Sequence, residues 1–311
     1  MPKADEMLHE LVSVRDWLRY AVSRFNAAEL AYGHGTATAL DEAAYLILHT
    51  LHLPIDQLDP WLDARLLPAE RSAVREMIEK RITTRMPAAY LTRQAFVQGY
   101  SFYVDERVIV PRSYIGELLC NYMATPSEDW HLGFDAGATR TALDLCTGSG
   151  CLAILAAFAF PDATIDASDV SADALAVAER NVRDYRLEDR VCLVQSDLFA
   201  GLSGRRYDLI LANPPYVGAE ALAAFPPEHA AEPRLAHAGG TDGLDIVRRI
   251  LAEAGDHLTP NGWLLVEVGS GRDILEQDYP GLPFLWLDTA ESQGEVFVLP
   301  ASALQAPGRR G

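Results

Sequence analysis

The chain contains 311 residues, 49% of them hydrophobic, and its mean hydropathy is +0.01. These values are typical of a water-soluble globular protein with one large domain and a smaller one. The chain carries 44 acidic and 26 basic residues, and a formal net charge of −18 repels a phosphate backbone, so it disfavours a free nucleic-acid substrate. Most of this charge follows residue 85, where 16 basic residues face 31 acidic ones, and such a surface attracts a basic protein.

The sequence also argues against a membrane, a secreted or a metal-binding protein. The longest apolar run, residues 151–160, is too short to cross a bilayer, and no charged and then apolar leader opens the chain. We therefore expect a cytoplasmic protein. The four cysteines lack paired spacing, and His49 and His52 have no evident third partner, so we expect buried thiols and no bound metal.

Residues 1–85 are predicted to form a small helical domain. Apolar residues recur with helical spacing over about residues 6–26, 39–52 and 68–85, and glycines and prolines separate these stretches. We expect this domain to recognise a partner.

Residues 86–112 are predicted to link the domains as a β-hairpin. Residues 88–110 have the pattern of two strands around Gly99. A helix is expected from about Ser113 to Met123, and residues 126–137 have the composition of a polar loop.

A strand, a glycine turn and a helix follow from residue 141 onward. Gly148 and Gly150 lie in the turn, where glycine lets the backbone approach a ligand, and Asp144 lies near the end of the preceding strand. The same glycines fit a dinucleotide-binding fingerprint, which leaves a nicotinamide or flavin enzyme as an alternative. Asp144 disfavours that alternative because a carboxylate is badly placed beside a pyrophosphate.

Two more acids follow the next two predicted strands. Residues 163–168 lead to Asp169, and residues 190–195 lead to Asp197 and Leu198. Because the carboxyl ends of parallel strands meet at one edge of a sheet, the three acids are expected to surround one ligand. They suit S-adenosylmethionine, with Asp144 near the sulfonium or amino group, Asp169 on the ribose, and Asp197 and Leu198 at the adenine.

The tetrapeptide Asn213-Pro214-Pro215-Tyr216 follows an apolar strand at residues 206–212. It is suited to a planar NH2 group, because the Asn213 side chain and the Pro214 carbonyl can each accept one of the two hydrogens. The two prolines stiffen the loop, and Tyr216 is placed to stack on the target. The pattern does not distinguish adenine from glutamine.

The remaining strands are expected near residues 261–268, 284–288 and 295–299, which completes a mainly parallel seven-stranded sheet. A turn at Gln293-Gly294 is predicted to make the last strand antiparallel. Residues 301–311 are predicted to be a disordered tail. The long connection at residues 217–241 is expected to be functional.

These residues resemble the class I S-adenosylmethionine-dependent methyltransferases, and within them the protein glutamine N(5)-methyltransferase family. The glycine turn and the tetrapeptide carry the wider resemblance, which extends from residue 141 to about residue 300. Residues 87–91 and 102–113 resemble the substrate-side segment of the glutamine methyltransferases, although Tyr114 replaces the proline that is common there. Residues 14–36 resemble the amino-terminal domain of members that act on ribosomal protein L-three.

The resemblance implies an α/β, Rossmann-like fold at residues 113–300, and transfer of a methyl group to a glutamine amide of ribosomal protein L-three. It implies catalytic roles for Asn213, Pro214 and Tyr216. The implied substrate-binding residues are Arg112, Pro215 and Tyr216. The implied cofactor-binding residues are Asp144, Thr147, Gly148, Gly150, Asp169, Asp197, Leu198 and Asn213.

Three alternatives remain at this point. Glutamine methylation of peptide chain release factors uses the same catalytic residues. Adenine methylation of nucleic acid is disfavoured by the acidic charge. A non-catalytic ribosome assembly factor is disfavoured by the intact tetrapeptide. The oligomeric state is not indicated by the sequence.

Overall fold

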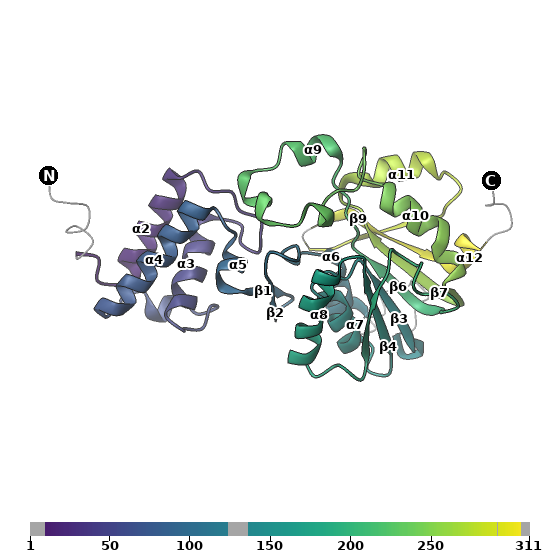
Figure 1. The fold of residues 1–311 in the computed structure, drawn as a ribbon, viewed down its shortest axis with the longest axis horizontal. Coiled ribbons are helices and arrows are strands. Elements are labelled where there is room, and N and C mark those ends of the chain that lie inside the picture. The colour runs from purple at the N-terminus through teal and green to yellow at the C-terminus, as the bar shows by residue number, and fades with distance from the viewer. Residues whose placement is uncertain (1–9, 124–135, 291, 306–311) are drawn as a thin grey trace. The chain divides into compact units, whose positions relative to one another are not determined.

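The computed structural model describes residues 10–123, 136–290 and 292–305. The chain forms two compact units (Figure 1). We call residues 1–95 with 226–231 the helical unit, and residues 96–225 with 232–311 the sheet unit. The described part of the chain contains no helix that is both long and apolar enough to span a membrane.

The described part of the helical unit contains three main helices and a short one. The helices are α2 (Val14–Ala27), α3 (Ala39–Thr50), α4 (Pro68–Thr84) and α5 (Ala88–Thr92), with the 3-10 turn η2 (Asp59–Trp61) between α3 and α4. The helix α2 starts at Val14, because Ser13 and Asp16 form a capping box, and residues 6–9 of the predicted stretch lie outside the described residues. Thr38 caps α3 in the same way, through a bond that its hydroxyl accepts from the Asp41 N–H.

Apolar side chains at helical spacing form the core of this unit. Trp17 and Phe25 from α2, Leu46 from α3 and Ile78 from α4 are each at most 1% exposed. Burying a side chain of this size stabilises the fold by about 1.5–3 kcal/mol. The core therefore explains why the periodic stretches of the sequence become helices that pack together.

The segment after α4 differs from its prediction. Residues 88–92 form the helix α5, so the strand predicted from residue 88 is wrong there. The hairpin is shorter, with strands β1 (Gln94–Val97) and β2 (Tyr100–Tyr103). Gln98 and Gly99 both have positive φ, at 51° and 79°, as a two-residue type I′ turn requires. The predicted helix after residue 113 is α6 (Tyr114–Leu118), continued by the π-helix η3 (Leu119–Met123).

The seven-stranded sheet confirms the predicted α/β, Rossmann-like class I methyltransferase fold. Its strand order is β5-β4-β3-β6-β7-β9-β8. The first five strands in this order are parallel, and β9 is antiparallel to both of its neighbours. The strands are β3 (Thr141–Leu145), β4 (Thr164–Asp169), β5 (Val191–Gln195), β6 (Tyr207–Ala212), β7 (Leu258–Glu267), β8 (Leu285–Asp288) and β9 (Gln293–Pro300).

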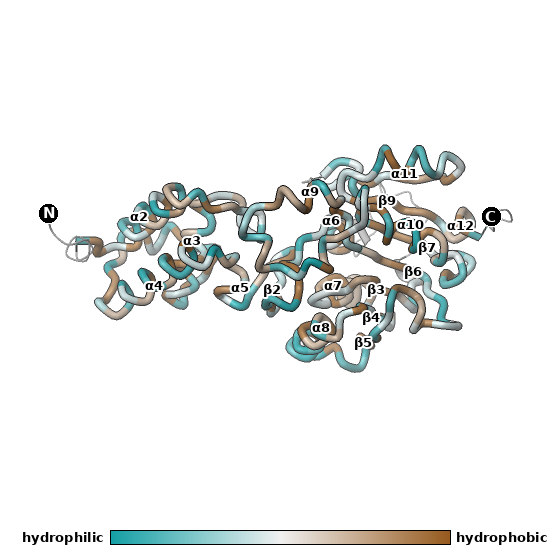
Figure 2. Tube along the Cα trace, turned by 45° about the horizontal axis from the view of Figure 1, so that its top comes forward, coloured by the Kyte–Doolittle hydropathy of each residue, from teal (hydrophilic) through white to brown (hydrophobic). Residues whose placement is uncertain are grey.

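Helices cover both faces of this sheet. Side chains alternate along a strand, so Ala142 packs in the core beneath α7 (Cys151–Ala159), whereas Leu143 packs in the core that includes α10 (Asp245–Glu253). α8 (Ala172–Asp184) lies on the first face. α11 (Arg272–Asp278) belongs to the second face. In Figure 2 the tube of β6 is mostly brown and α8 carries teal residues, as expected for a buried strand and a covering helix.

Three details of the prediction need correction or fall outside the described residues. Asp288 pairs with Gln293, so the last turn lies at residues 289–292 and Gln293 already belongs to β9. Ala301–Leu304 form the helix α12, whose residues Ala301 and Leu304 are buried, so the predicted disordered tail is wrong for these four residues. Residues 306–311, and most of the predicted polar loop at 126–137, lie outside the described residues.

The connection after the tetrapeptide is not a plain loop. It contains α9 (Ala219–Ala223) and the 3-10 turns η5 (Pro227–Ala231) and η6 (Arg234–Ala236). Two glycine residues at its end, Gly240 and Gly243, have φ values of 96° and 89°, which other residues rarely adopt.

Candidate active site

A cavity of about 340 Å³ lies at the carboxyl ends of the parallel strands, entirely within the sheet unit. This is where ligands bind in open α/β sheets. Six of the predicted site residues line it together: Gly148, Asp169, Asp197, Leu198, Asn213 and Pro215. The sequence separates these residues by up to 67 positions, and the strand order brings them to one edge.

The glycine turn is fixed by the acid at the end of the neighbouring strand. The Gly148 N–H donates to Asp169 Oδ2 at 3.0 Å, and the Ser171 N–H donates to Asp169 Oδ1 at 2.9 Å. Burial raises the pKa of Asp169 above its ordinary value, and these two bonds oppose that effect. Cys146 and Leu198, which also line the cavity, have φ values of 58° and 48°. Left-handed backbone at residues other than glycine is strained and often accompanies a functional site.

Three residues predicted to contact the cofactor do not line the cavity. Asp144 is 1% exposed, and its Oδ2 accepts from Thr147 Oγ1 at 2.5 Å and from the Ala153 N–H at 3.0 Å. Asp144 and Thr147 therefore brace the turn from behind. Gly150 starts α7 with φ 80°, and a Cβ there would lie 3.1 Å from Ala178 Cβ on α8. Gly150 thus permits the two helices to pack closely.

Burial raises the pKa of Asp144 to about 7, although its two bonds oppose the shift. Its Oδ1 is buried and has no hydrogen-bond partner within the described residues. An unpaired buried oxygen is costly for the ionised carboxylate, in agreement with the raised pKa of Asp144.

Asp197 lines the cavity but is already paired. Arg249, from α10, donates from Nη2 to Asp197 Oδ1 at 2.9 Å. Arg249 also lines the cavity. The carboxylate that is predicted to contact the adenine is therefore already in an ion pair with Arg249.

Asn213 is oriented by the segment that precedes α6. Its Nδ2 donates to the Arg112 carbonyl oxygen at 3.1 Å. No hydrogen bond to its Oδ1 is formed within the described residues, and the side chain lines the cavity. The bond fixes the amide plane, so that Oδ1 is available as an acceptor for a ligand NH2 group.

Tyr216 is anchored away from the cavity. Its hydroxyl donates to Glu267 Oε1 at 3.0 Å, and its ring lies against Gly269, where a Cβ would be 2.9 Å from the ring carbon Cε2. Burial and the neighbouring Glu267 raise the pKa of Tyr216 above its ordinary value. The structure does not place Tyr216 among the residues that line the cavity, where stacking on a target was expected.

Glu267 joins the tetrapeptide to the start of α6. Besides the Tyr216 hydroxyl, its Oε2 accepts from Ser113 Oγ at 2.6 Å and from the Tyr114 N–H at 2.9 Å. Burial raises the pKa of Glu267 to about 7. Tyr114 replaces a proline expected from the resemblance, and only a residue other than proline has the N–H that forms this bond.

Glycines allow the following loop to lie directly on the tetrapeptide. A Cβ at Gly239 would lie 2.7 Å from the Pro215 carbonyl oxygen, and a Cβ at Gly243 would overlap the Tyr216 carbonyl oxygen. Two backbone bonds hold the loop, from Val217 N to His237 O at 2.9 Å and from Gly239 N to Val217 O at 3.0 Å. These glycines are therefore required by close approach of two backbones.

Arg112 is held by a buried acid of this loop. Its Nη1 and Nη2 donate to the two oxygens of Glu232, both at 3.1 Å, in a bidentate pair. Glu232 also accepts from the Val110 N–H at 2.9 Å, and His237 Nε2 lies 2.9 Å from its Oε2. The Arg112 guanidinium thus organises the segment whose carbonyl orients Asn213.

Comparison with known proteins identifies the family. The methyltransferase small domain family matches residues 131–225, which include the glycine turn and the tetrapeptide. A ribosomal protein uL3 glutamine methyltransferase from Bradyrhizobium diazoefficiens is 54% identical over 95% of this chain and 92% of its own length. Proteins of the same name from Burkholderia pseudomallei and Neisseria gonorrhoeae are 54% and 55% identical, over 94% and 95% of this chain and 96% of their own length. The chain belongs to the uL3 glutamine methyltransferase family.

Membership of this methyltransferase family implies the use of S-adenosylmethionine. The cavity fits such a ligand in two respects. A hypothetical Cβ at Gly148 would meet no atom within 4 Å, so the turn is open toward the cavity, and a partly buried acid, Asp169, lies beside it. The volume is also within the usual range for ligand pockets, about 300–1,000 Å³.

Four residues at or beside the site of this enzyme were not predicted from the sequence: Arg249, Glu232, Gly239 and Gly243. The only available signal for Glu232 and Gly239 was the length and glycine content of the connection at residues 217–241, and for Gly243 it was the glycine-rich stretch at residues 239–243. Arg249 gave no signal, because an arginine on an amphipathic helix is ordinarily solvated.

Proposed function

We propose that this enzyme transfers a methyl group from S-adenosylmethionine to the side-chain amide nitrogen of a glutamine in ribosomal protein uL3. The observation that carries the proposal is the orientation of Asn213, whose Nδ2 is bound to the Arg112 carbonyl and whose Oδ1 is available beside the cavity. The names of relatives that match almost their full length support uL3 as the protein substrate.

On the cofactor side, bound S-adenosylmethionine supplies an electrophilic methyl group on a sulfonium sulfur. Asp169 is proposed to accept hydrogen bonds from the ribose hydroxyls, and Asp197 and Leu198 are proposed to contact the adenine. The Gly148 backbone gives the ligand room. Asp144 and Thr147 act indirectly, since they hold the turn.

On the substrate side, Asn213 Oδ1 and the Pro214 carbonyl are proposed to accept one amide hydrogen each, with Pro215 at the cavity wall. An amide nitrogen is a poor nucleophile, so the rate depends on fixing its plane toward the methyl group. The nitrogen gains the methyl group and loses a proton to water, and S-adenosylhomocysteine is the other product. No side-chain base is needed, because the methylated nitrogen is strongly acidic.

Recognition of the protein substrate is assigned to other parts of the chain. The helical domain at residues 1–85 is proposed to contact uL3. The net charge of −18 favours a basic protein and disfavours direct binding of nucleic acid. A ribosomal protein as substrate fits a cytoplasmic enzyme.

The test compares three acceptors. The enzyme is incubated with S-adenosylmethionine carrying a labelled methyl group and, in separate reactions, with uL3, a peptide chain release factor and duplex DNA. Peptide mass spectrometry then locates the label. We expect one labelled glutamine in uL3 and no label in DNA. Preferential labelling of the release factor would overturn the assignment of the substrate, and labelled adenine would overturn the assignment of the reaction.

A further inference from the structure

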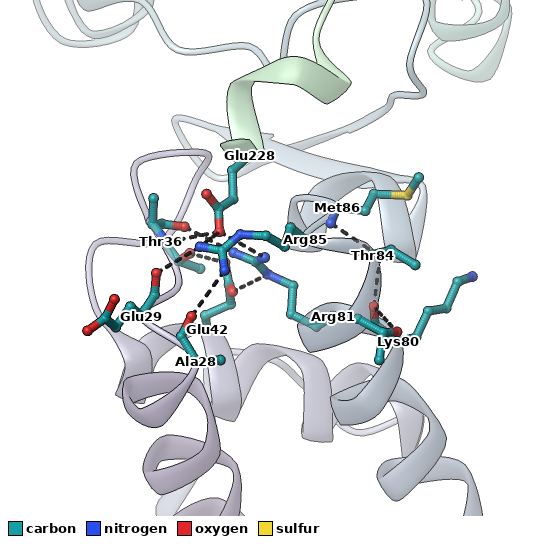
Figure 3. A network of polar contacts seen from close by, with 12 residues as sticks. Ala28, Glu29, Thr36, Glu42, Lys80, Arg81, Thr84, Arg85, Met86 and Glu228 are labelled. Carbon is teal, nitrogen blue, oxygen red and sulfur yellow. Dashed lines mark hydrogen bonds and ion pairs between the residues drawn. The ribbon is translucent and has the colours of Figure 1, made fainter. Parts of the chain in front are cut away.

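The helical unit contains a buried network of charged side chains (Figure 3). Arg81 is fully buried, and its Nε donates to Glu42 Oε1 at 2.7 Å. Arg81 Nη2 donates to the Ala31 carbonyl oxygen at 3.0 Å. Arg85 donates to the carbonyl oxygens of Ala28 and Glu29 at the end of α2, at 3.0 Å and 2.7 Å.

The second acid of this network comes from a distant part of the sequence. Glu228, 1% exposed, belongs to the turn η5, and Figure 3 shows its side chain pointing toward Arg85 and Arg81. Glu228 Oε1 accepts from the Ala31 N–H at 3.1 Å and lies 2.8 Å from Arg85 Nη2 and 3.7 Å from Arg81 Nη1. The segment 226–231 therefore packs as part of the helical unit, although residues 225 and 232 on either side of it belong to the sheet unit.

The network is electrically balanced only with Glu228 in place. Two arginines face two acids, Glu42 and Glu228, and both acids are at most 1% exposed. Without Glu228, the partly exposed Arg85 would lose its carboxylate partner and the buried Arg81 would keep only Glu42, which is unfavourable. The site on the helical unit that receives Glu228 is thus specific for a carboxylate.

Residues 217–228, which we call the arch, join the tetrapeptide to this network. At its start the arch is held by the Val217 bonds to the loop and by the Ala219 N–H, which donates to the Gly240 carbonyl at 3.1 Å. Its middle is α9, which has no buried side chain. Since α9 has little packing of its own, the arch depends on its two ends.

We propose that Glu228 is a positioning residue that anchors the far end of the arch in the helical unit and thereby restrains the segment that follows the tetrapeptide when the protein substrate binds. This inference rests on the proposed function. It gives the network of Arg81, Arg85, Glu42 and Glu228 a role in binding the protein substrate. The arch follows the proposed amide-binding tetrapeptide directly in the chain, and the helix α9 within it has no buried side chain, so this segment is accessible to a polypeptide. Loss of the anchor weakens capture of the protein and leaves cofactor binding unchanged.

The test pairs Glu228→Gln with Glu42→Gln as a matched control. Both replacements are nearly isosteric and each removes one buried acid beside Arg81, but only Glu228 lies on the arch. Hydrogen–deuterium exchange of the full-length enzyme is measured without substrate, and kcat and KM are then measured with uL3 below the melting temperature of each variant.

We expect Glu228→Gln to accelerate exchange in residues 219–225 and to raise KM by about tenfold with kcat nearly unchanged. Glu42→Gln is expected to lower the melting temperature without either effect. A purely structural role would reduce the active fraction and so lower kcat, with KM constant. The exchange measurement does not depend on the substrate, so failure of the anchor is distinguishable from failure of the proposed function.

Equal changes in both variants, or unaltered exchange of residues 219–225 in Glu228→Gln, would overturn the proposal. If Glu228→Gln does not fold, Arg85→Met gives the same test, because it removes the nearest cation of Glu228 while Arg81 keeps Glu42 as partner. Arg85→Met is then expected to accelerate exchange in residues 219–225 and to raise KM.

Discussion

The two sides of the active site are held together in different ways. On the cofactor side, the bonds that shape the glycine turn join residues close in sequence, with Asp144 and Thr147 separated by 3 positions and Gly148 and Asp169 by 21. On the substrate side, Asn213 is oriented by a residue 101 positions away, and Ser113 meets Glu267 across 154 positions. The cofactor side is thus a local supersecondary structure, whereas the substrate side is formed only when distant parts of the chain come together in the complete fold.

Because of this difference, we expect cofactor affinity and kcat to depend on different residues. Local bonds form the proposed cofactor site from one strand-turn-helix unit and the next strand, a recurrent arrangement in α/β proteins. The proposed amide-binding site needs the segment before α6, the end of β7 and the loop at residues 232–243 at the same time. We therefore expect substitutions on the substrate side to affect kcat while cofactor affinity is retained, and the reverse on the cofactor side.

The largest effect is expected for Asn213→Ala. The substitution removes the acceptor that fixes the amide plane, so kcat should fall by about 10²- to 10³-fold. Calorimetric titration should show S-adenosylmethionine affinity close to that of the wild type. Asn26→Ala, at an exposed position of α2, serves as the control and should change neither quantity. Loss of cofactor binding in Asn213→Ala would contradict the division between the two sides.

Asp169→Ala tests the cofactor side. Its carboxylate holds the Gly148 N–H and is proposed to bind the ribose, so the Kd for S-adenosylmethionine should rise by about 10- to 100-fold. Asp166→Ala is the matched control on the same strand, because Asp166 binds Arg205 and Tyr207. An effect confined to kcat at saturating cofactor would show that the ribose assignment is wrong.

A smaller effect is expected for Gly239→Ala. The new methyl group would lie 2.7 Å from the Pro215 carbonyl, so the loop must move away from the tetrapeptide. Displacement of this kind should lower kcat by about tenfold and leave cofactor affinity unchanged. Gly281→Ala has no atom within 4 Å of the added Cβ and should be neutral. Unchanged kcat in Gly239→Ala would show that the loop does not support the amide site.

The sequence was sufficient for the fold class and for six of the residues that line the cavity. Strand ends in a parallel sheet meet at one edge, so acids at those ends are predictable as neighbours from spacing alone. The sequence was less informative about which of these side chains face the cavity and which are buried behind it. Asp144 lies behind the turn and not in the cavity, because a strand-end side chain can point to either side of the backbone.

The substrate side was not predictable in the same way. Bonds such as those of Glu232 with Arg112 and of Glu228 with Arg85 join residues more than 100 positions apart, and no local pattern signals them. Tyr216 was expected to stack on the target, but its hydroxyl is bound to Glu267. Tertiary contacts decide the direction of such a side chain, and a single sequence does not contain that information.

The smallest effect on activity is expected for Glu267→Gln, and its main effect should be on the pH dependence of stability. Burial raises the pKa of Glu267 from 4.5 in the unfolded chain to about 7 in the folded enzyme. The folded state therefore binds more protons between these values, and its stability falls as pH rises from about 4.5 to 7.

Glutamine can accept from Ser113 and Tyr114 through its oxygen and donate through its NH2 group to the Tyr216 hydroxyl oxygen, which reverses that one bond. Because glutamine does not ionise, this part of the pH-dependent loss, about 1–3 kcal/mol, should disappear. Urea unfolding of the wild type and of Glu267→Gln from pH 5 to pH 8 measures it. Asp144, whose pKa is also raised to about 7, contributes in both proteins and cancels in the difference. If the stability of both proteins changes with pH in the same way, the Glu267 carboxyl group does not titrate in the folded enzyme between pH 5 and pH 8.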